Sequence, residues 1–244
     1  MLRDIFTEEK LQQQAALLQR KFSPGFDGMD AKAAAIWISI NGKKLINEII
    51  SGRYTPQPAL GFHIAKKDGH FRQLSKLTAI DTIIQNCILD AISNVCESKF
   101  SAHSFAYRPG LGIKDALKQF CLYGSQYRYV AKLDPRACFD SIPHEKLFSA
   151  LNAFLGEKYR GVVSLIMKYA AMPLFIEGKI DPRIWGILQG APLSPLLCNI
   201  FLSQMDAMLE EMDVPFLRYA DDLAVFAQST DELNAITDRV REKI

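Results

Sequence analysis

The sequence lacks any apolar run of the roughly 20 residues that are needed to span a membrane. Its N-terminus has an early acid, Asp4, and no apolar core segment, so we expect no secretion signal. It also lacks paired cysteines, because its five Cys are an odd number and contain no Cys-x-x-Cys motif. This pattern disfavours a disulfide or zinc framework and favours free thiols in a reducing compartment. We therefore predict a cytoplasmic protein with no membrane contact.

The chain is rich enough in apolar residues to form a substantial core. Its 244 residues are 49% hydrophobic, which suits one large domain or two closely packed subdomains. Residues 1–80 contain 12 Lys and Arg against 7 Asp and Glu, whereas residues 81–244 contain 17 against 20. A basic part joined to an acid-bearing part suits a polyanion-binding surface beside a metal site. A chance imbalance with a solvated basic face is the alternative.

The most informative stretch is 216–226, in which two apolar runs flank Asp221 and Asp222. This pattern predicts a β-hairpin with the two acids at its tip. Adjacent carboxylates repel each other, so the pair is useful mainly where a cation lies between them. An ordinary polar turn is the alternative interpretation.

A third acid ends another strand-like segment, 128–134. Its alternation places Val130, Lys132 and Asp134 on one face of a strand and residues 129, 131 and 133 on the other. If the second face packs on helices, Asp134 is presented on the open face. Three carboxylates that meet on one sheet would suit two Mg²⁺ ions about 4 Å apart, with Mn²⁺ as the alternative ion. Such a site performs nucleotidyl transfer, in which positioning and charge neutralisation do most of the work.

The other elements follow from apolar spacing and turn residues. We predict helices over 7–21, over about 30–52 with a break at Asn41-Gly42, from a cap at Asp81, after Gly110, from about His144, over 158–171, after Ser194, and from Thr230 or Asp231 to the last residue. The apolar sides of the second and fourth of these helices are predicted to include Ile36, Ile40, Leu45, Ile49, Ile50, Ile113, Ala116, Leu117 and Phe120. Hairpins are predicted over 62–74 and 174–180.

The first of these hairpins carries Lys66, Lys67 and Arg72. Cations on such a hairpin could close over a triphosphate, with Arg giving forked contacts to phosphate oxygens. A solvated basic hairpin is the alternative. The later segment 104–110 combines aromatic residues with Arg108, which is typical of loops that stack on nucleic acid.

Five blocks in a fixed order now resemble one family. The blocks are 66–74, 104–110, 134–144, 189–199 and 219–222, within a resemblance that covers roughly residues 10 to 240. Together they look like the fingers and palm of a bacterial reverse transcriptase, closest to the group II intron and retron-type lineage. The resemblance implies an α+β fold with a right-hand polymerase palm, an antiparallel sheet packed on helices. It places residues 1–125 mainly in the fingers and 126–244 mainly in the palm, and we expect the thumb to be absent from this sequence.

The resemblance also implies roles for individual residues. Asp134, Asp221 and Asp222 match the catalytic metal-binding acids, and the carbonyl of Pro135 matches a backbone metal ligand. The implied nucleotide-binding residues are Lys66, Lys67, Arg72, Phe139, Gln189 and Gly190, and the implied nucleic-acid contacts are Arg108 and Tyr219.

Phe139 matches the bulky residue that lies under the incoming sugar in this family. An aromatic ring there would clash with a ribose 2′-hydroxyl, so it favours deoxynucleotides. Related RNA-dependent RNA polymerases usually place a second Asp at this spacing, which can hydrogen-bond the hydroxyl. A core phenylalanine is the alternative.

His144 is interpreted as structural. Two departures from the family pattern are Leu188, where proline is common, and the unusual loop 135–138.

The leading hypothesis is an RNA-directed DNA polymerase that adds dNTPs to the 3′-hydroxyl of a DNA or RNA primer on an RNA template. One alternative is a defence-type or CRISPR-associated reverse transcriptase that needs a dedicated RNA or protein partner. A non-catalytic RNA-binding module is the third. A thumb or maturase region supplied separately is a further expected partner of the catalytic core.

Overall fold

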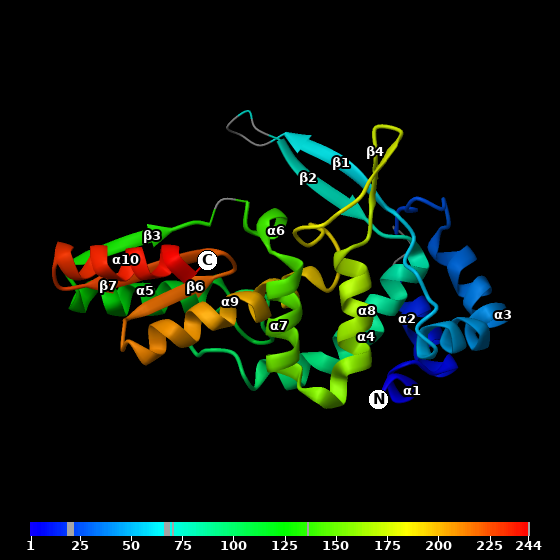
Figure 1. Cartoon of the computed structure of the whole chain (residues 1–244), viewed down its shortest axis with the longest axis horizontal. Helices are drawn as coiled ribbons and strands as arrows, with labels where there is room; N and C mark the ends of the chain where they lie inside the picture. The colour runs from blue at the N-terminus through cyan, green and yellow to red at the C-terminus, as the bar shows by residue number, and fades with distance from the viewer. Residues whose placement is uncertain (19–21, 66–68, 70, 136, 244) are drawn as a thin grey trace. The chain divides into compact units, whose positions relative to one another are not determined.

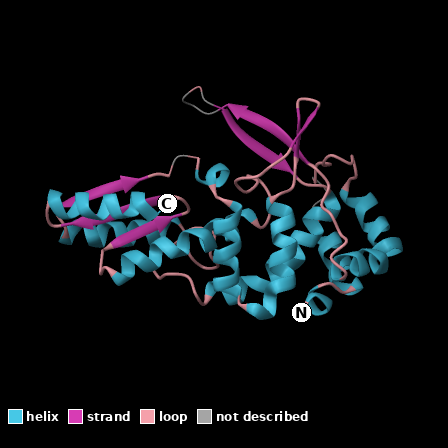
Figure 2. Cartoon of the chain, in the orientation of Figure 1, coloured by secondary structure: helices cyan, strands magenta, loops and turns pink. Residues whose placement is uncertain are grey.

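The computed structural model describes residues 1–18, 22–65, 69, 71–135 and 137–243. The chain forms two compact units, each made of two segments. The first unit contains Met1–Asn94 and Phe139–Ser194, and the second contains Val95–Cys138 and Pro195–Ile244. Figure 2 shows that both units combine helices with a sheet. The predicted α+β class is therefore confirmed, whereas the division into fingers and palm near residue 125 stays a prediction.

The first unit is largely helical and carries a small mixed sheet on one side of its helices (Figure 1). Its helices are α1 (Leu2–Ile5), α2 (Glu8–Leu17), α3 (Ala31–Ile50), α4 (Ala79–Glu97, which continues into the second unit), α7 (His144–Leu155) and α8 (Arg160–Ala170), with a 3₁₀ turn at Glu157–Tyr159. Its strands are β1 (Ala59–Ala65), β2 (Phe71–Lys76), β4 (Leu174–Ile176) and β5 (Lys179–Asp181), in the order β2-β1-β4-β5. The β1–β4 pair is parallel and the other two pairs are antiparallel.

The second unit is built on an antiparallel sheet in the order β3-β7-β6. Its strands are β3 (Tyr129–Leu133), β6 (Phe216–Tyr219) and β7 (Asp222–Ala227). Its helices are α5 (Ile113–Gln126), α9 (Ser194–Glu211) and α10 (Thr230–Lys243), with the short α6 (Cys138–Ser141) at the boundary between the units. Helix α10 packs on β3 and β7, and α5 packs against β6. Of the three predicted catalytic acids, Asp222 begins β7, Asp221 directly precedes it, and Asp134 directly follows β3.

Three details of the predicted helices are wrong. Helix α3 runs unbroken through Asn41-Gly42. The Asn41 amide donates to the Trp37 carbonyl of the preceding turn, and Gly42 is buried on the side that packs on α2, where packing outweighs the cost of about 1 kcal/mol for a helical glycine. Asp81 does not cap α4, since Thr78 precedes the helix, and its hydroxyl accepts from the Asp81 backbone N–H and donates to the Asp81 carboxylate.

The third error concerns which side chains face inward. Ile36 and Ile40 are 55% and 75% exposed, and α3 instead buries Ala34 and Ile38 together with Leu45 and Ile49. In α5, the predicted inward residues Ile113 and Leu117 are both 55% exposed, and Ala116 is buried. Phe120 is 39% exposed but does face the core, because its ring lies edge-on to that of Phe226. Apolar spacing identifies a helix but cannot say which apolar stripe finds a partner.

Candidate active site

The acidic hairpin forms as predicted, with a two-residue turn. Tyr219 of β6 pairs with Asp222 of β7, so Ala220 and Asp221 make the turn. The neighbouring ladder pairs Leu133 of β3 with Leu223 of β7, so the next residue of the chain, Asp134, falls in register with Asp222. The three acids therefore lie at the same end of one sheet.

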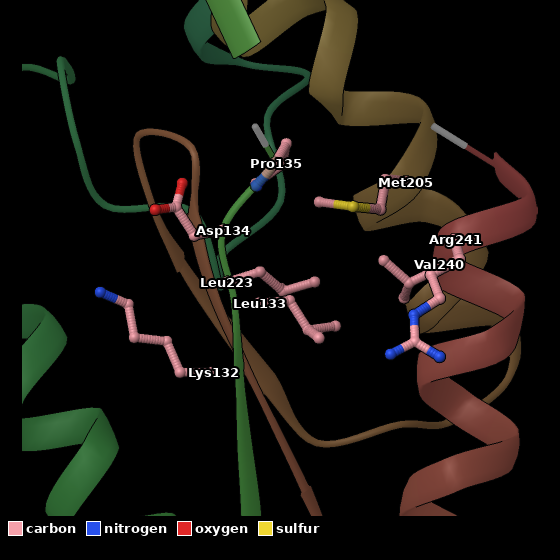
Figure 3. A pocket seen from close by; sticks show the side chains of 8 residues that line it. All are labelled: Lys132, Leu133, Asp134, Pro135, Met205, Leu223, Val240 and Arg241. Carbon is pink, nitrogen blue, oxygen red and sulfur yellow. The ribbon is translucent and has the colours of Figure 1, made fainter. Parts of the chain in front are cut away.

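The sheet of the second unit has one face against helices and one that is partly open. Figure 3 shows Leu133 and Leu223 directed toward Met205 of α9 and Val240 of α10, whereas Lys132 and Asp134 project from the opposite side of β3. On that opposite side, α5 and its neighbours cover β6 and β7, with a cluster of Phe105, Ala116, Leu217, Ala224 and Phe226. Strand β3 stays open there, and Asp134 is exposed as the alternation predicted.

A lysine ammonium pairs with one of the three carboxylates. The Nζ of Lys132 is 2.8 Å from Oδ1 of Asp222, and both side chains are more than half exposed. The hydrogen bond and the charge of Asp222 raise the pKa of Lys132, and the charges of Asp134 and Asp221 add to the effect. The charges of all three acids thus act on the same ammonium.

The donor chemistry fits a divalent metal of the Mg²⁺ type. Carboxylate oxygens are the ligands that Mg²⁺ and Mn²⁺ favour, and a site beside exposed strand ends leaves room for bound water. Within the described part of the chain, no three His, Cys, Asp or Glu side chains are already arranged around one point to hold an ion. Because Lys132 is paired with Asp222, the ammonium and a metal would compete for the same carboxylate. The residues fit the ion, provided that this ion pair opens.

A pocket of about 410 Å³ adjoins the end of β3 (Figure 3). Apolar side chains of β3, β7, α9 and α10 form much of its lining, and Arg241 of α10 adds a cation. Asp134 and Pro135 also line it. Pro135, the predicted backbone ligand, is therefore placed directly after the first acid at the edge of a cavity.

A buried arginine lies beneath the acidic turn, and sequence reasoning missed it. Arg218 is 0% exposed, and its guanidinium binds Asp206 and Asn199 of α9 and the carbonyl of Ala220. A signal was available in the sequence: Asn199 and Asp206 share the helical face of Leu202 and Leu209, so both polar residues had to be buried with a partner. The partner could not be identified from spacing alone.

A hydrogen bond with Cys138 and burial disfavour the reactive thiolate form of the Cys198 thiol near this site. Cys198 of α9 is fully buried and hydrogen-bonded to Cys138, and these two effects raise the pKa of the Cys198 thiol well above its ordinary value. Burial likewise raises the pKa of Cys87 and of Cys96 to about 12. All five cysteines are free, as the sequence predicted. The chemistry of the site therefore rests on oxygen and nitrogen groups.

Four of the predicted nucleotide-binding residues are connected within the first unit. Phe139 accepts a backbone hydrogen bond of 2.7 Å from Ile187, at the start of the loop that contains Gln189 and Gly190. At the other end of this loop, the carbonyl of Gln189 accepts hydrogen bonds from the backbone N–H and the hydroxyl of Ser75, 2.7 and 2.8 Å long. Ser75 belongs to β2, which also carries Arg72.

Gly190 is required by this close approach to β2. Its φ is +106°, and a Cβ at this position would lie 2.5 Å from the carbonyl oxygen of Ser75. A side chain would therefore push the loop away from the strand that carries Arg72. The remaining predicted cations of the hairpin, Lys66 and Lys67, lie outside the described residues.

The two predicted nucleic-acid contacts have internal partners. The guanidinium of Arg108 donates to Glu97 and to the carbonyls of Ser101 and Ser104, and its side chain is 8% exposed. Tyr219 is half-buried and packs against the apolar cluster on the side of the sheet that α5 covers. Both residues shape the second unit, and their contact with nucleic acid stays a prediction. His144, interpreted as structural, contacts the Gly186 carbonyl at 2.8 Å.

Within the described part of the chain, none of the helices combines the length and the apolar composition of a membrane span.

Comparison with known proteins identifies several relatives. The chain is 28% identical over 203 residues to the group II intron-encoded protein LtrA of Lactococcus lactis subsp. cremoris, a match that covers 82% of this chain and 34% of that protein. It is 28% identical over 252 residues to the retron Mx65 reverse transcriptase of Myxococcus xanthus, covering 98% and 54%. The chain thus spans about half or less of these curated relatives.

Solved structures show the same fold at lower identity. A partial Cas6-RT-Cas1–Cas2 complex matches 99% of this chain and 41% of its own, with a TM-score of 0.60 and 22% identity. An apo telomerase from Candida tropicalis matches 84% and 52%, with a TM-score of 0.57 and 16% identity. These likenesses bear out the predicted fingers and palm fold. The family model described as "Reverse transcriptase (RNA-dependent DNA polymerase)" matches residues 64–244, and the chain therefore belongs to the reverse transcriptase family.

Proposed function

We propose that this chain is the catalytic core of an RNA-directed DNA polymerase, which adds dNTPs to a primer 3′-hydroxyl on an RNA template. The observation that carries the proposal is the placement of Asp134, Asp221 and Asp222 at the same end of one sheet, where the ammonium of Lys132 pairs with Asp222. Membership of the reverse transcriptase family supports the same conclusion. A non-catalytic RNA-binding module would have no need to hold three carboxylates together at this end of the sheet.

The three acids are proposed to hold Mg²⁺, with the Pro135 carbonyl as an additional ligand. When bound, two such ions would lower the pKa of the attacking hydroxyl and neutralise the leaving pyrophosphate. Asp222 would exchange its ion pair with Lys132 for the metal, and Lys132 would then be free to face the incoming phosphates. Once the Lys132–Asp222 pair has opened, the sheet would keep the three acids at one end of its strands, which limits the reorganisation needed at the moment of reaction.

The nucleotide is proposed to bind against the connected residues of the first unit. Arg72, with Lys66 and Lys67, would grip the triphosphate, and Gln189 and Gly190 would contact the nascent base pair. The hydrogen bonds that join this loop to β2 support the proposal, because they couple the loop's position to the strand that carries Arg72. Arg108 and Tyr219 are proposed as contacts to the template.

Phe139 is proposed to exclude ribonucleotides. We expect Phe139→Ala to raise incorporation of rNTPs relative to dNTPs by about 10-fold, the usual effect of reshaping an apolar pocket. The measurement is competitive single-nucleotide incorporation. Phe148→Ala is the control, because Phe148 is a 48% exposed aromatic residue of α7. An unchanged ratio in Phe139→Ala would make Phe139 a packing residue.

The proposed partners are an RNA template, a DNA or RNA primer and dNTPs, in a cytoplasmic setting. A thumb or maturase region, or a separate protein, is proposed to hold the primer–template duplex, since the chain spans about half or less of its relatives. A dedicated RNA would copurify with the protein and direct its synthesis. Nuclease treatment before the assay distinguishes it from a generic template.

Primer extension tests the central proposal. The purified chain is incubated with an RNA template, a DNA primer, Mg²⁺ and dNTPs beside Asp221→Asn. We expect a loss of more than about 100-fold in the variant, because even the outer partners of metal ligands cost 10- to 100-fold when removed. The matched control is Glu211→Gln, which neutralises an exposed acid of α9. Extension that persists in Asp221→Asn, or its absence from a wild-type chain that binds the primer–template, contradicts the proposal.

A further inference from the structure

We propose that Arg218 is a positioning residue that holds the acidic turn in the conformation that binds the metal. The inference rests on the proposed function of the three acids and adds a residue that touches neither metal nor substrate. Arg218 lies at the centre of a buried polar network that ties the turn to α9. Its role follows from what its guanidinium contacts, from the backbone conformation of the turn, and from the absence of solvent.

The guanidinium of Arg218 makes four hydrogen bonds to three partners. Its Nε and Nη2 donate to the two carboxylate oxygens of Asp206, at 2.7 and 2.5 Å, which is the forked arrangement that only arginine makes. Its Nη1 donates to Oδ1 of Asn199 and to the carbonyl of Ala220, both at 2.8 Å. Arg218 is 0% and Asp206 1% exposed, so water cannot replace a lost contact.

The Ala220 contact links this network to the acids. Ala220 is the first residue of the turn, directly before Asp221, and its φ is 59°. A residue with a Cβ seldom adopts this left-handed conformation, and it persists only where the surroundings hold it. The hydrogen bond from Arg218 supplies such a hold. It fixes the orientation of the peptide group that leads into Asp221.

Both ends of the network are anchored. The Asn199 amide donates to the Ala106 carbonyl at 2.9 Å, which leaves its Oδ1 directed at Arg218. The backbone of Arg218 also bonds on both sides to the loop before α5, with its N–H to His103 and its carbonyl to Phe105. The turn is therefore attached both to α9 and to this loop, through elements that are themselves buried. An ion pair that served stability alone would not need the fourth hydrogen bond to the turn.

The test measures metal binding directly. Mn²⁺ is titrated into the wild-type chain and followed by electron paramagnetic resonance, without primer or nucleotide. We expect Arg218→Lys to weaken the binding that depends on Asp221 by about 10-fold or more, as outer-shell partners of metal ligands do. Lysine keeps a positive charge next to Asp206, but it reaches the acceptor oxygens of Asn199 and Ala220 less well than arginine does. Asn199→Ala keeps the Arg218–Asp206 fork, is expected to weaken binding less, and serves if Arg218→Lys does not fold.

Two further variants separate positioning from general stability. Leu209→Ala creates a cavity in α9, at a fully buried residue that is not part of the Arg218 network. We expect this variant to unfold more easily but to bind Mn²⁺ with unchanged affinity. Adding Ala220→Gly to Arg218→Lys should restore part of the affinity, because glycine adopts positive φ without strain.

The outcomes distinguish the inference from the proposed function. If wild type and Asp221→Asn bind Mn²⁺ equally, the assignment of the acids as metal ligands fails. If binding depends on Asp221 but folded Arg218→Lys and Asn199→Ala bind as tightly as wild type, the inference about Arg218 alone is overturned. Loss of affinity in Leu209→Ala equal to that in Arg218→Lys would also overturn it, because stability would then explain both.

Discussion

Among the residues that the structure describes, two carboxylates are buried almost completely, and their hydrogen-bond partners differ in charge. Asp206 in the second unit, 1% exposed, faces the guanidinium of Arg218. Asp81 in the first unit, 0% exposed, faces only neutral donors: the hydroxyls of Tyr54, Tyr169 and Thr78 and a backbone N–H. One acid has a charged partner and the other has none.

The difference has a physical consequence for Asp81. Burial disfavours its charged form and raises its pKa, and the hydrogen bonds from Tyr54, Thr78 and Tyr169 only partly oppose this effect. Asp81 still joins α4 to α8 and to the segment after α3 through the two tyrosines. A buried acid with neutral donors thus serves as a structural junction, whereas the charged pair lies directly under the acidic turn.

The largest expected effect is that of Arg218→Met on stability. The change leaves Asp206 buried without a counter-charge, and removing one partner of a buried ion pair typically costs about 3–5 kcal/mol. We expect a loss of this size in the free energy of unfolding, measured by urea denaturation. Hydrogen exchange of peptides from 195–244 assigns the loss to the second unit.

Replacing both partners sharpens this result. The double variant Arg218→Met with Asp206→Leu removes both charges, and buried ion pairs replaced by apolar residues are often neutral in stability. We expect it to recover more than half of the loss. A double variant as unstable as the single one would show that the contacts of Arg218 to Asn199 and Ala220, and not the charge pair, dominate the energy of the network.

Asp81→Asn is expected to have a smaller effect, of about 1–3 kcal/mol, because it leaves buried donors imperfectly paired and removes no counter-charge. Its pH dependence is the more specific signature. The folded pKa of Asp81 is raised, so the wild type gains stability from this group below its unfolded pKa of about 3.9 and loses it as the pH rises through the folded pKa. The advantage of the wild type over Asp81→Asn should therefore shrink from pH 4 to pH 8.

The two tryptophans make this measurement possible. Trp37 and Trp185 both belong to the first unit, so their fluorescence during urea unfolding reports on the unit that contains Asp81. Subtracting the variant's curve from that of the wild type cancels every other titrating group. An advantage of the wild type that grows with pH would mean that the hydrogen bonds to Asp81 outweigh its burial, and the contrast with Asp206 would disappear.

Sequence reasoning succeeded where the pattern was local. The acidic hairpin and the strand before Asp134 follow from alternation and turn residues, and the order of five motifs identified the family. It could not find the Arg218 network, because the pairing of Arg218 with Asp206 and Asn199 depends on how β6 crosses α9. A polar residue on a buried face signals that a partner exists without saying which one.

The errors have the same origin. The residues Ile113, Leu117 and Phe120 have helical spacing in α5, yet they remain substantially exposed, while the small residue Ala116 meets the sheet. Periodicity counts apolar residues but carries no information on the shape of the opposing surface, where β6 and β7 already bring large aromatic side chains. Ala116 then packs closest, Ile113 and Leu117 are left largely exposed, and Phe120 contacts the sheet only through an edge contact with the Phe226 ring.

Lys132→Met tests the exposed counterpart of the buried ion pair and should give the smallest effect. Lys132 and Asp222 are 68% and 51% exposed, so water and salt screen their attraction. Removing the ammonium frees Asp222, and we expect Mn²⁺ affinity to rise by about two- to fivefold, in keeping with the modest strength of exposed pairs. The rise should shrink at high salt, and Lys132→Arg, which keeps the charge, should not show it. Unchanged affinity in Lys132→Met at low salt would mean that the ammonium and the metal do not compete, and that Asp222 is available to an ion in both states.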